Sequence, residues 1–206
     1  DIDETDAITL SSVTTSDGSI TVDSGGALAA TLIDSSATDN DANDISLTVT
    51  TGDIAVVTIT AGSTNDVTLT AAGAITEDGD ALTVVRADEL TAASGGVITL
   101  DTTVATADLA TYAFGAIDID ETDAITLSSV TTSDGSITVD AGGAMTATLV
   151  DSSATDNDAN DISLTTTVGD IAVVTITAGS TNDVTLTAAG AITEDGDALT
   201  VVRADE

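Results

Sequence analysis

Apolar residues alternate with hydroxyl residues along most of the chain. Ile8-Thr9-Leu10, Ile20-Thr21-Val22 and Ile45–Val49 show the alternation, which returns at residues 67–70 and 98–100. A period of two residues predicts short β-strands with one buried face. Clusters of Gly, Asp and Ser separate these segments and predict tight turns. No segment has a convincing helical period, so we expect an all-β protein.

A nearly identical internal repeat covers most of the chain. Residues 1–89 return as residues 118–206 at an offset of 117 residues, and 83 of the 89 aligned positions are the same. We therefore expect a first repeat unit at 1–117 and a second, incomplete unit at 118–206, both within one continuous structure. Tandem copies of one module are typical of proteins that build length or valency rather than one asymmetric active site.

A weaker period lies inside each unit. Similar phrases begin at Ser19, Asp44, Asp66, Asp88 and Ala116. The five segments have a mean length of about 23 residues, a size typical of repeats that stack into solenoids. One segment per coil predicts a parallel β-solenoid, a right-handed β-helix, with about five coils per unit. In such a fold each coil pairs with its neighbours, and inward Ile, Val and Leu stack into a narrow core.

Tandem β-sandwich domains of the immunoglobulin or cadherin-like type are the alternative fold, because the repeat unit is also a suitable length for one such domain. Two observations disfavour it. The chain has no Trp, and its single Tyr and single Phe lie outside the repeated residues, so an aromatic core anchor is missing. The phrases repeated within each unit have no reason to exist in a sandwich.

The charge balance limits the classes of partner that the chain is expected to bind. The chain has two Arg residues, 36 acidic residues and no Lys or His, so its net charge is -34. Nucleic acid and anionic membrane surfaces would be repelled, whereas cations would be attracted. No apolar run approaches the roughly 20 residues that span a bilayer, so we expect no membrane insertion in this segment. Without His, Lys or Cys no base and nucleophile pair is evident, and we expect no enzymatic activity.

Two acidic motifs are candidate metal sites. The run from Asp39 to Asp44 offers oxygen ligands at alternate positions, as calcium loops do, although it lacks the Gly and the closing Glu of an EF-hand. A second cluster begins each unit. Since only oxygen donors are available, hard divalent cations, Ca²⁺ above all, are favoured over Zn²⁺. The candidate ligands are Asp39, Asp41, Asn43, Asp44, Asp156, Asp158, Asn160, Asp161, Asp118, Asp120, Glu121 and Asp123. The alternative is that these residues only keep a solvated loop soluble.

Several phrases resemble a known family. GSITVDSGGALAATL and NDISLTVTTGDIAVVTITAG are similar to the repetitive stalk regions of large secreted bacterial adhesins, the filamentous-haemagglutinin-like exoproteins with β-helical repeats. The resemblance implies an extracellular or cell-surface location and a structural role, and it supplies no catalytic residues.

The function we expect is a structural tandem-repeat stalk or filament segment, stabilised by divalent cations. The alternative is a surface-layer or extracellular-matrix fibre protein, in which further copies associate end to end or side by side. Adhesive binding of glycans is a third possibility, disfavoured because exposed aromatic platforms are not expected.

Overall fold

The computed structural model describes residues 1–38, 42–77, 79, 84–155, 159–194 and 201–205, and every regular element among them is a β-strand. The strands, in chain order, are Ile2–Glu4 (β1), Ile8–Leu10 (β2), Val13–Thr14 (β3), Ile20–Ser24 (β4), Leu28–Asp34 (β5), Ile45–Val49 (β6), Ile54–Thr60 (β7), Val67–Ala71 (β8), Ile75–Glu77 (β9), Val84–Ser94 (β10), Ile98–Phe114 (β11), Ile117–Glu121 (β12), Ile125–Asp134 (β13), Ile137–Ala141 (β14), Met145–Asp151 (β15), Ile162–Thr166 (β16), Ile171–Thr177 (β17), Val184–Ala188 (β18), Ile192–Glu194 (β19) and Val201–Arg203 (β20).

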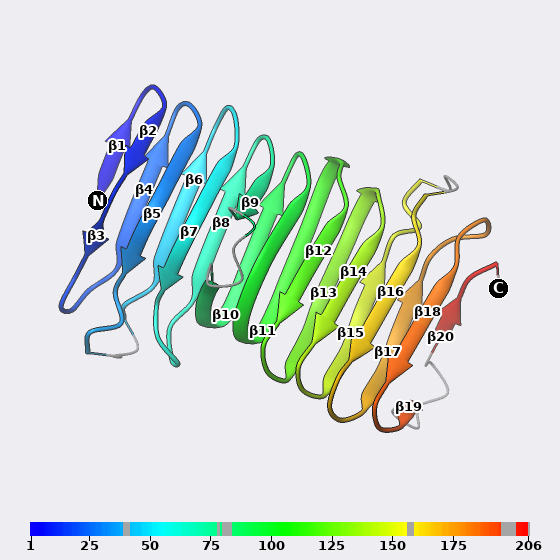
Figure 1. The fold of residues 1–206 in the computed structure, drawn as a ribbon. Coiled ribbons are helices and arrows are strands. Elements are labelled where there is room, and N and C mark those ends of the chain that lie inside the picture. Colours follow the sequence, from blue (N-terminus) through cyan, green and yellow to red (C-terminus); the bar gives the residue numbers. More distant parts are fainter. Residues whose placement is uncertain (39–41, 78, 80–83, 156–158, 195–200, 206) are drawn as a thin grey trace.

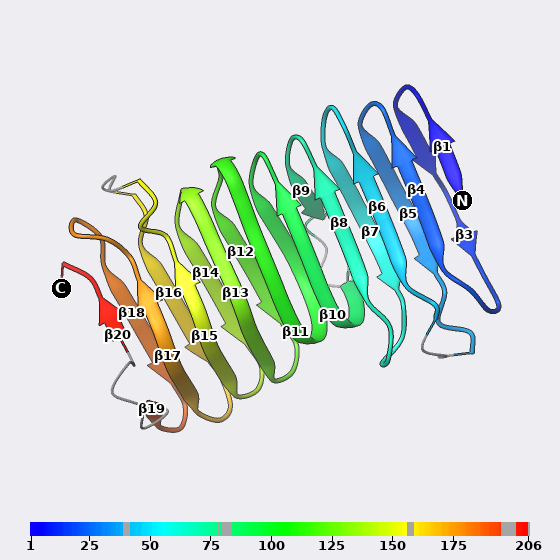
Figure 2. The same cartoon turned by 180° about the vertical axis from the view of Figure 1, so that it is seen from behind.

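All the strand pairings are parallel, and they form two ladders that run the length of a rod. Ladder A contains β1, β4, β6, β8, β13, β15, β17, β19 and β20, and ladder B contains β2, β3, β5, β7, β9, β12, β14, β16 and β18. β10 and β11 turn through a corner and contribute to both ladders, which joins them into one 20-stranded sheet. Figures 1 and 2 show the stacked coils, with the two termini at opposite ends. The prediction of a parallel β-solenoid is confirmed.

One column of inward side chains gives the mean length of a coil. Eight register steps in ladder B lead from Ile8 to Val184, which gives a mean coil of about 22 residues, close to the predicted length. The column is Ile8, Leu28, Ile54, Ile75, Ile98, Ile117, Ile137, Ile162 and Val184. Its members from Leu28 to Ile162 are buried in the single hydrophobic core.

The repeat unit and the coil are out of step by half a coil. Five steps of ladder A lead from Ile20 to Leu127. Ile137, the copy of Ile20, instead begins β14 in ladder B, about half a coil further along. A unit therefore spans five and a half coils rather than the predicted five. Equivalent residues of the two units point to opposite sides of the rod.

The extra half coil lies in the segment that occurs once in the chain. Leu90 pairs with Ala107, a step well below the mean coil length, because β11 continues through its corner without a loop. The phrase that begins at Ala116 therefore falls in ladder B, whereas the similar phrases of the first unit fall in ladder A. Segments with similar local sequence therefore lie in different ladders before and after this half coil.

Glycine allows successive coils to approach at one corner. The N–H of Gly96 donates to the carbonyl of Gly73 at 2.9 Å, and Gly115 lies against Gly96 on the next coil. A Cβ atom at Gly115 would overlap the carbonyl oxygen of Gly96. The spacing of about 4.8 Å between paired strands leaves no room for a side chain directed at the neighbouring backbone.

Spin labels test the half-coil offset, because the chain contains no Cys. Ala29 and Thr138 lie five coils apart in ladder B, whereas Thr146, the copy of Ala29, lies in ladder A. Labels at Ala29→Cys and Thr146→Cys should be about 10 Å further apart than labels at Ala29→Cys and Thr138→Cys, since the core separates them and the label arms point in opposite directions. Electron–electron double resonance measures both distances. Equal distances would contradict the offset.

Candidate functional site

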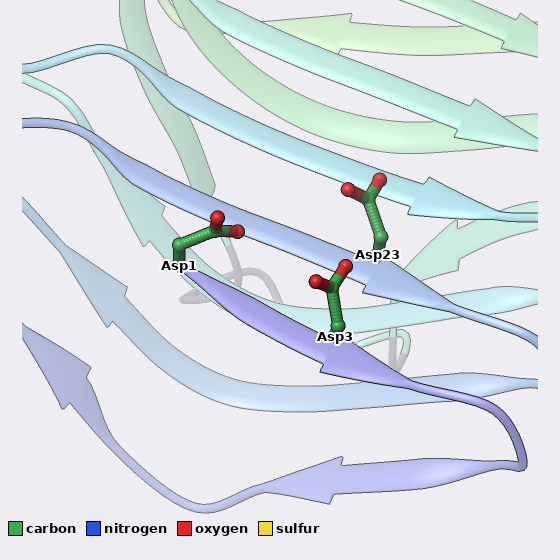
Figure 3. A group of neighbouring side chains, drawn as sticks. All are labelled: Asp1, Asp3 and Asp23. Carbon is green, nitrogen blue, oxygen red and sulfur yellow. The ribbon is translucent and has the colours of Figure 1, made fainter.

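Three carboxylates of the first unit meet on the outer surface of ladder A. Asp1 and Asp3 are two positions apart and so project to the same side, and Asp3 pairs in register with Asp23 of β4. One oxygen from each side chain lies within 4.8 Å of the other two (Figure 3). All three residues are exposed. The coil register therefore brings together acidic residues that are one coil apart in the sequence.

The second unit carries the copies of these residues on ladder B. Asp118, Asp120 and Asp140 are the copies, and Asp120 pairs with Asp140. Among the described residues, the approach of three carboxylates to within 4.8 Å is found at Asp1, Asp3 and Asp23 and not at these copies. Asp101 pairs with Asp120 from the preceding coil, which gives three acidic residues in one column. Paired strands are about 4.8 Å apart, so these residues lie on neighbouring strands of one face. We call Asp101, Asp118, Asp120 and Asp140 the acidic cluster.

An open hollow borders the carboxylates in each unit. The hollow in the first unit has a volume of about 390 Å³, and that in the second about 330 Å³. Seven lining residues of one are the copies of seven lining residues of the other. In the first unit these are Asp3, Glu4, Thr5, Asp23, Ser24, Gly25 and Thr50, and in the second Asp120, Glu121, Thr122, Asp140, Ala141, Gly142 and Thr167. The repeat therefore presents one hollow twice, on opposite sides of the rod.

Two members of the acidic cluster have perturbed pKa values. Partial burial raises the pKa of the Asp101 carboxyl, and repulsion from Glu77, Asp120 and Asp118 raises it further. Partial burial, followed by repulsion from Asp120 and Asp140, raises the pKa of Asp118. Both effects penalise the ionised form. A cation in the cluster would reverse this penalty.

The donors of the two clusters suit a hard cation. Carboxylate and hydroxyl oxygens are the only side-chain ligands that line the hollows, and Ca²⁺ takes six to eight oxygen ligands. Three or four carboxylates would supply part of such a shell, and water would supply the remainder. Mg²⁺ also accepts mixed carboxylate and water shells, so the donors suit both cations.

Asn43 and Asp44, the described candidate ligands of the Asp39 to Asp44 motif, make hydrogen bonds to neighbouring coils. Asn43 is buried, and its Oδ1 accepts a hydrogen bond from the N–H of Gly18 at 2.6 Å. The N–H of Asn43 donates to Oδ1 of Asn65 at 2.9 Å, and Asn160 and Asn182 repeat this contact at 3.0 Å. These amides form a hydrogen-bonded ladder between coils. Asp39, Asp41, Asp156 and Asp158 lie outside the described residues.

The outer residues of that motif are engaged as well. One oxygen of Asp44 accepts the N–H of Asp66 at 3.0 Å, and Asp161 does the same for Asp183 at 2.9 Å. Both carboxylates are exposed, so each keeps a second oxygen toward solvent. Their role as metal ligands stays a prediction.

Glu121 lines the same hollow as Asp120, whereas Asp123 does not. Glu121 is buried, and its Oε2 accepts hydrogen bonds from Thr102 Oγ1 at 2.8 Å and from the N–H of Val104 at 3.0 Å. Its Oε1 accepts the N–H of Asp123 at 2.9 Å. Glu121 thus satisfies backbone groups at a corner. Asp123 lines a separate hollow of about 420 Å³, which also contains Arg86 and Asp88.

Asp23, Asp101 and Asp140 were not predicted as site residues, yet they complete the two clusters. The sequence does contain a signal, since each lies one coil away from the acidic residue with which it pairs. That spacing has meaning only when the local coil length is known. Coils of this chain differ widely in length, from the short step between Leu90 and Ala107 to the long step between Leu28 and Ile54.

No family model, curated protein or solved structure matches this chain. Among the described residues there is also no helix that is long and apolar enough to cross a membrane.

Acidification should stabilise the fold. Because the pKa values of Asp101 and Asp118 are raised above 3.8 in the folded state, their stabilising contribution is present at low pH and is lost as pH rises through the folded values. In chelator, the melting temperature should therefore increase as pH falls from 7 toward 4. Asp101→Asn should raise the melting temperature at pH 7 and reduce this pH dependence. Asp183→Asn removes an exposed charge outside the cluster and is the control; an equal effect of the two variants would contradict the interpretation.

Proposed function

We propose that this chain is a segment of a structural stalk or filament, located outside a bacterial cell or on its surface and stabilised by divalent cations. The observation that supports it is the continuity of the strand pairing from one unit to the next. Leu100 of the first unit pairs with Ile119 of the second, and both are buried. A solenoid built in this way gains length with each unit and keeps its cross-section.

Extension requires resistance to bending, and the pairing between coils supplies it. The hydrogen bonds of parallel strands run between neighbouring coils, along the rod axis. Bending would strain these bonds and the stacked core together, because both run continuously through the described coils. The buried polar side chains contribute, since every buried side-chain nitrogen and oxygen among the described residues has a hydrogen-bond partner.

Divalent cations have a clear physical role in this proposal. Stacking places Asp101, Asp120 and Asp140 in one column, and the chain has only two Arg residues to offset 36 acidic ones. Repulsion of this kind opposes a compact state. Ca²⁺ or Mg²⁺ bound between neighbouring coils would reduce the repulsion and would also cross-link the coils. The resemblance to bacterial adhesin stalks agrees with this arrangement.

A surface-layer or matrix fibre protein is the second candidate. The half-coil offset favours it, because equivalent residues of successive units lie on opposite ladders. A rod with the same surface on both sides offers two equivalent lateral contacts, which is what assembly into sheets requires. We rank it second because the net charge of -34 opposes side-by-side contact unless cations intervene.

Imaging of concatemers tests the stalk. Chains of two, four and eight complete repeat units should appear as thin rods that lengthen by about 26 Å per unit at constant width, since five and a half coils each rise about 4.8 Å. Negative-stain electron microscopy measures length and width. Sheets or bundles at all concentrations would favour the assembly protein instead, and a beaded outline would contradict both.

Thermal melting tests whether divalent cations stabilise the fold. Calcium at about 100 times its dissociation constant should add about 2.7 kcal/mol to the free energy of unfolding, which corresponds to roughly 5–10 °C. Asp120→Asn with Asp140→Asn should remove part of this gain, whereas Asp183→Asn with Asp205→Asn, which changes the charge equally, should not. Sodium chloride at matched ionic strength controls for screening. An unchanged midpoint between calcium and chelator would refute cation stabilisation.

A further inference from the structure

The only Tyr and the only Phe of the chain are both exposed at one edge of the rod. Tyr112 retains 56% and Phe114 80% of its accessible surface. They are two positions apart at the end of β11, where the register with β13 shifts between Thr111 and Phe114, and Ala113 between them is exposed as well. The expectation that exposed aromatic groups are missing is therefore wrong.

Tyr112 is held in place as a platform. Its hydroxyl donates a hydrogen bond of 2.6 Å to the carbonyl of Ala71, which is two coils earlier in ladder A. The ring lies close to Gly95 on the intervening coil, where an added Cβ would be 3.4 Å from the ring edge. Fixing the ring in advance lowers the entropy that a partner would lose on binding.

Exposed apolar side chains gather at this edge. Val97 is 39% exposed, and its backbone N would lie 2.8 Å from a Cβ at Gly115, the residue that follows Phe114. Of the six exposed large hydrophobic residues among those described, three are Val97, Tyr112 and Phe114. We call these three the aromatic edge. Clustered exposed apolar groups mark interaction surfaces more often than scattered ones do.

Acidic residues occur on strands next to those that carry the aromatic edge. Asp134 of β13 pairs with Phe114 in register. Asp118, four positions after Phe114, lies beyond the corner in the acidic cluster with Asp101 and Asp120. Partial burial, and then repulsion among these carboxylates, raises the pKa of Asp101 and of Asp118.

We propose that the aromatic edge and the carboxylates beside it form a docking surface for a basic protein segment that contains both Arg or Lys and apolar residues. A guanidinium group binds the face of an aromatic ring and pairs with carboxylates, so one Arg-rich segment suits both parts of the surface. Charge complementarity selects this partner. The net charge of -34 attracts basic segments and repels a second copy of the chain.

Tyr112 is a built-in reporter, because the chain has no other Tyr and no Trp. The probe is a short peptide of alternating Arg and Leu, and the control probe carries Gln in place of Arg. Titrations use the full chain in chelator, so that binding is measured independently of bound calcium. We expect a saturable change in Tyr112 emission with the Arg peptide and none with the Gln peptide.

Variants separate the rings from general electrostatic attraction. Phe114→Ala keeps the charge and the reporter and should weaken binding about 2- to 5-fold. Tyr112→Ala with Phe114→Ala, measured by calorimetry, should weaken it about 5- to 25-fold. Val168→Ala removes an exposed apolar group from another corner and should leave affinity unchanged. Circular dichroism melts verify that each variant is folded.

Several results would overturn the proposal. Equal affinity of the wild type and the double variant would show that the peptide binds through charge alone. Equal binding of the Gln peptide would indicate an apolar rather than a basic partner. A change in Tyr112 emission with a neutral oligosaccharide such as cellohexaose, but not with the Arg peptide, would indicate a glycan. Dimerisation in sedimentation that Phe114→Ala abolishes would indicate a second copy.

Discussion

Parallel backbone pairing between coils is the interaction on which the rest of the structure depends. A single coil of about 22 residues encloses too few side chains to bury them by itself, so each coil is stable only between its neighbours. The pairing also fixes which residues stack. In β12, Ile119 lies inside and Asp120 outside, and the same register that aligns Ile119 with Val139 aligns Asp120 with Asp140. A shift by one residue would exchange the two faces. The apolar core and the column of carboxylates are thus two results of one register.

Repulsion within the outer column of carboxylates opposes folding, because the chain has few cations to neutralise the column. Glu121 shows how the fold satisfies a carboxylate when it can, with hydrogen bonds from Thr102 and from two backbone N–H groups. Asp101 and Asp118 instead face other carboxylates, and partial burial followed by this repulsion raises the pKa of each. On the proposal of cation stabilisation, ions that screen this repulsion would favour close packing of neighbouring coils.

The alternation of Ile, Val and Leu with Thr and Ser was sufficient to predict the strands, because the period of two residues reflects the pleat itself. The weaker period of about 23 residues predicted the solenoid. The phrase that begins at Ala116 did not reveal its change of ladder, since both ladders accept the same local pattern. Asn43 was a plausible ligand by type, but its amide is turned inward to pair with Gly18, and sequence spacing does not distinguish an inward from an outward oxygen. Asp140 was missed because coil lengths vary. Exposed aromatic platforms were not expected, and the position of Tyr112 depends on a hydrogen bond to Ala71, two coils away.

Because of the half-coil offset, the direction that a residue faces depends on whether an even or an odd number of units precedes it. Adding one complete unit moves every later residue along the axis and rotates it to the other side of the rod, while adding two units restores its direction. A duplication or deletion of a single unit would therefore turn whatever lies beyond it to face the opposite way, and would change the reach of the rod by only about 26 Å. Rods with even and odd numbers of units therefore differ in the direction that the segment beyond them faces. Each repeat sets this orientation as well as the length of the rod.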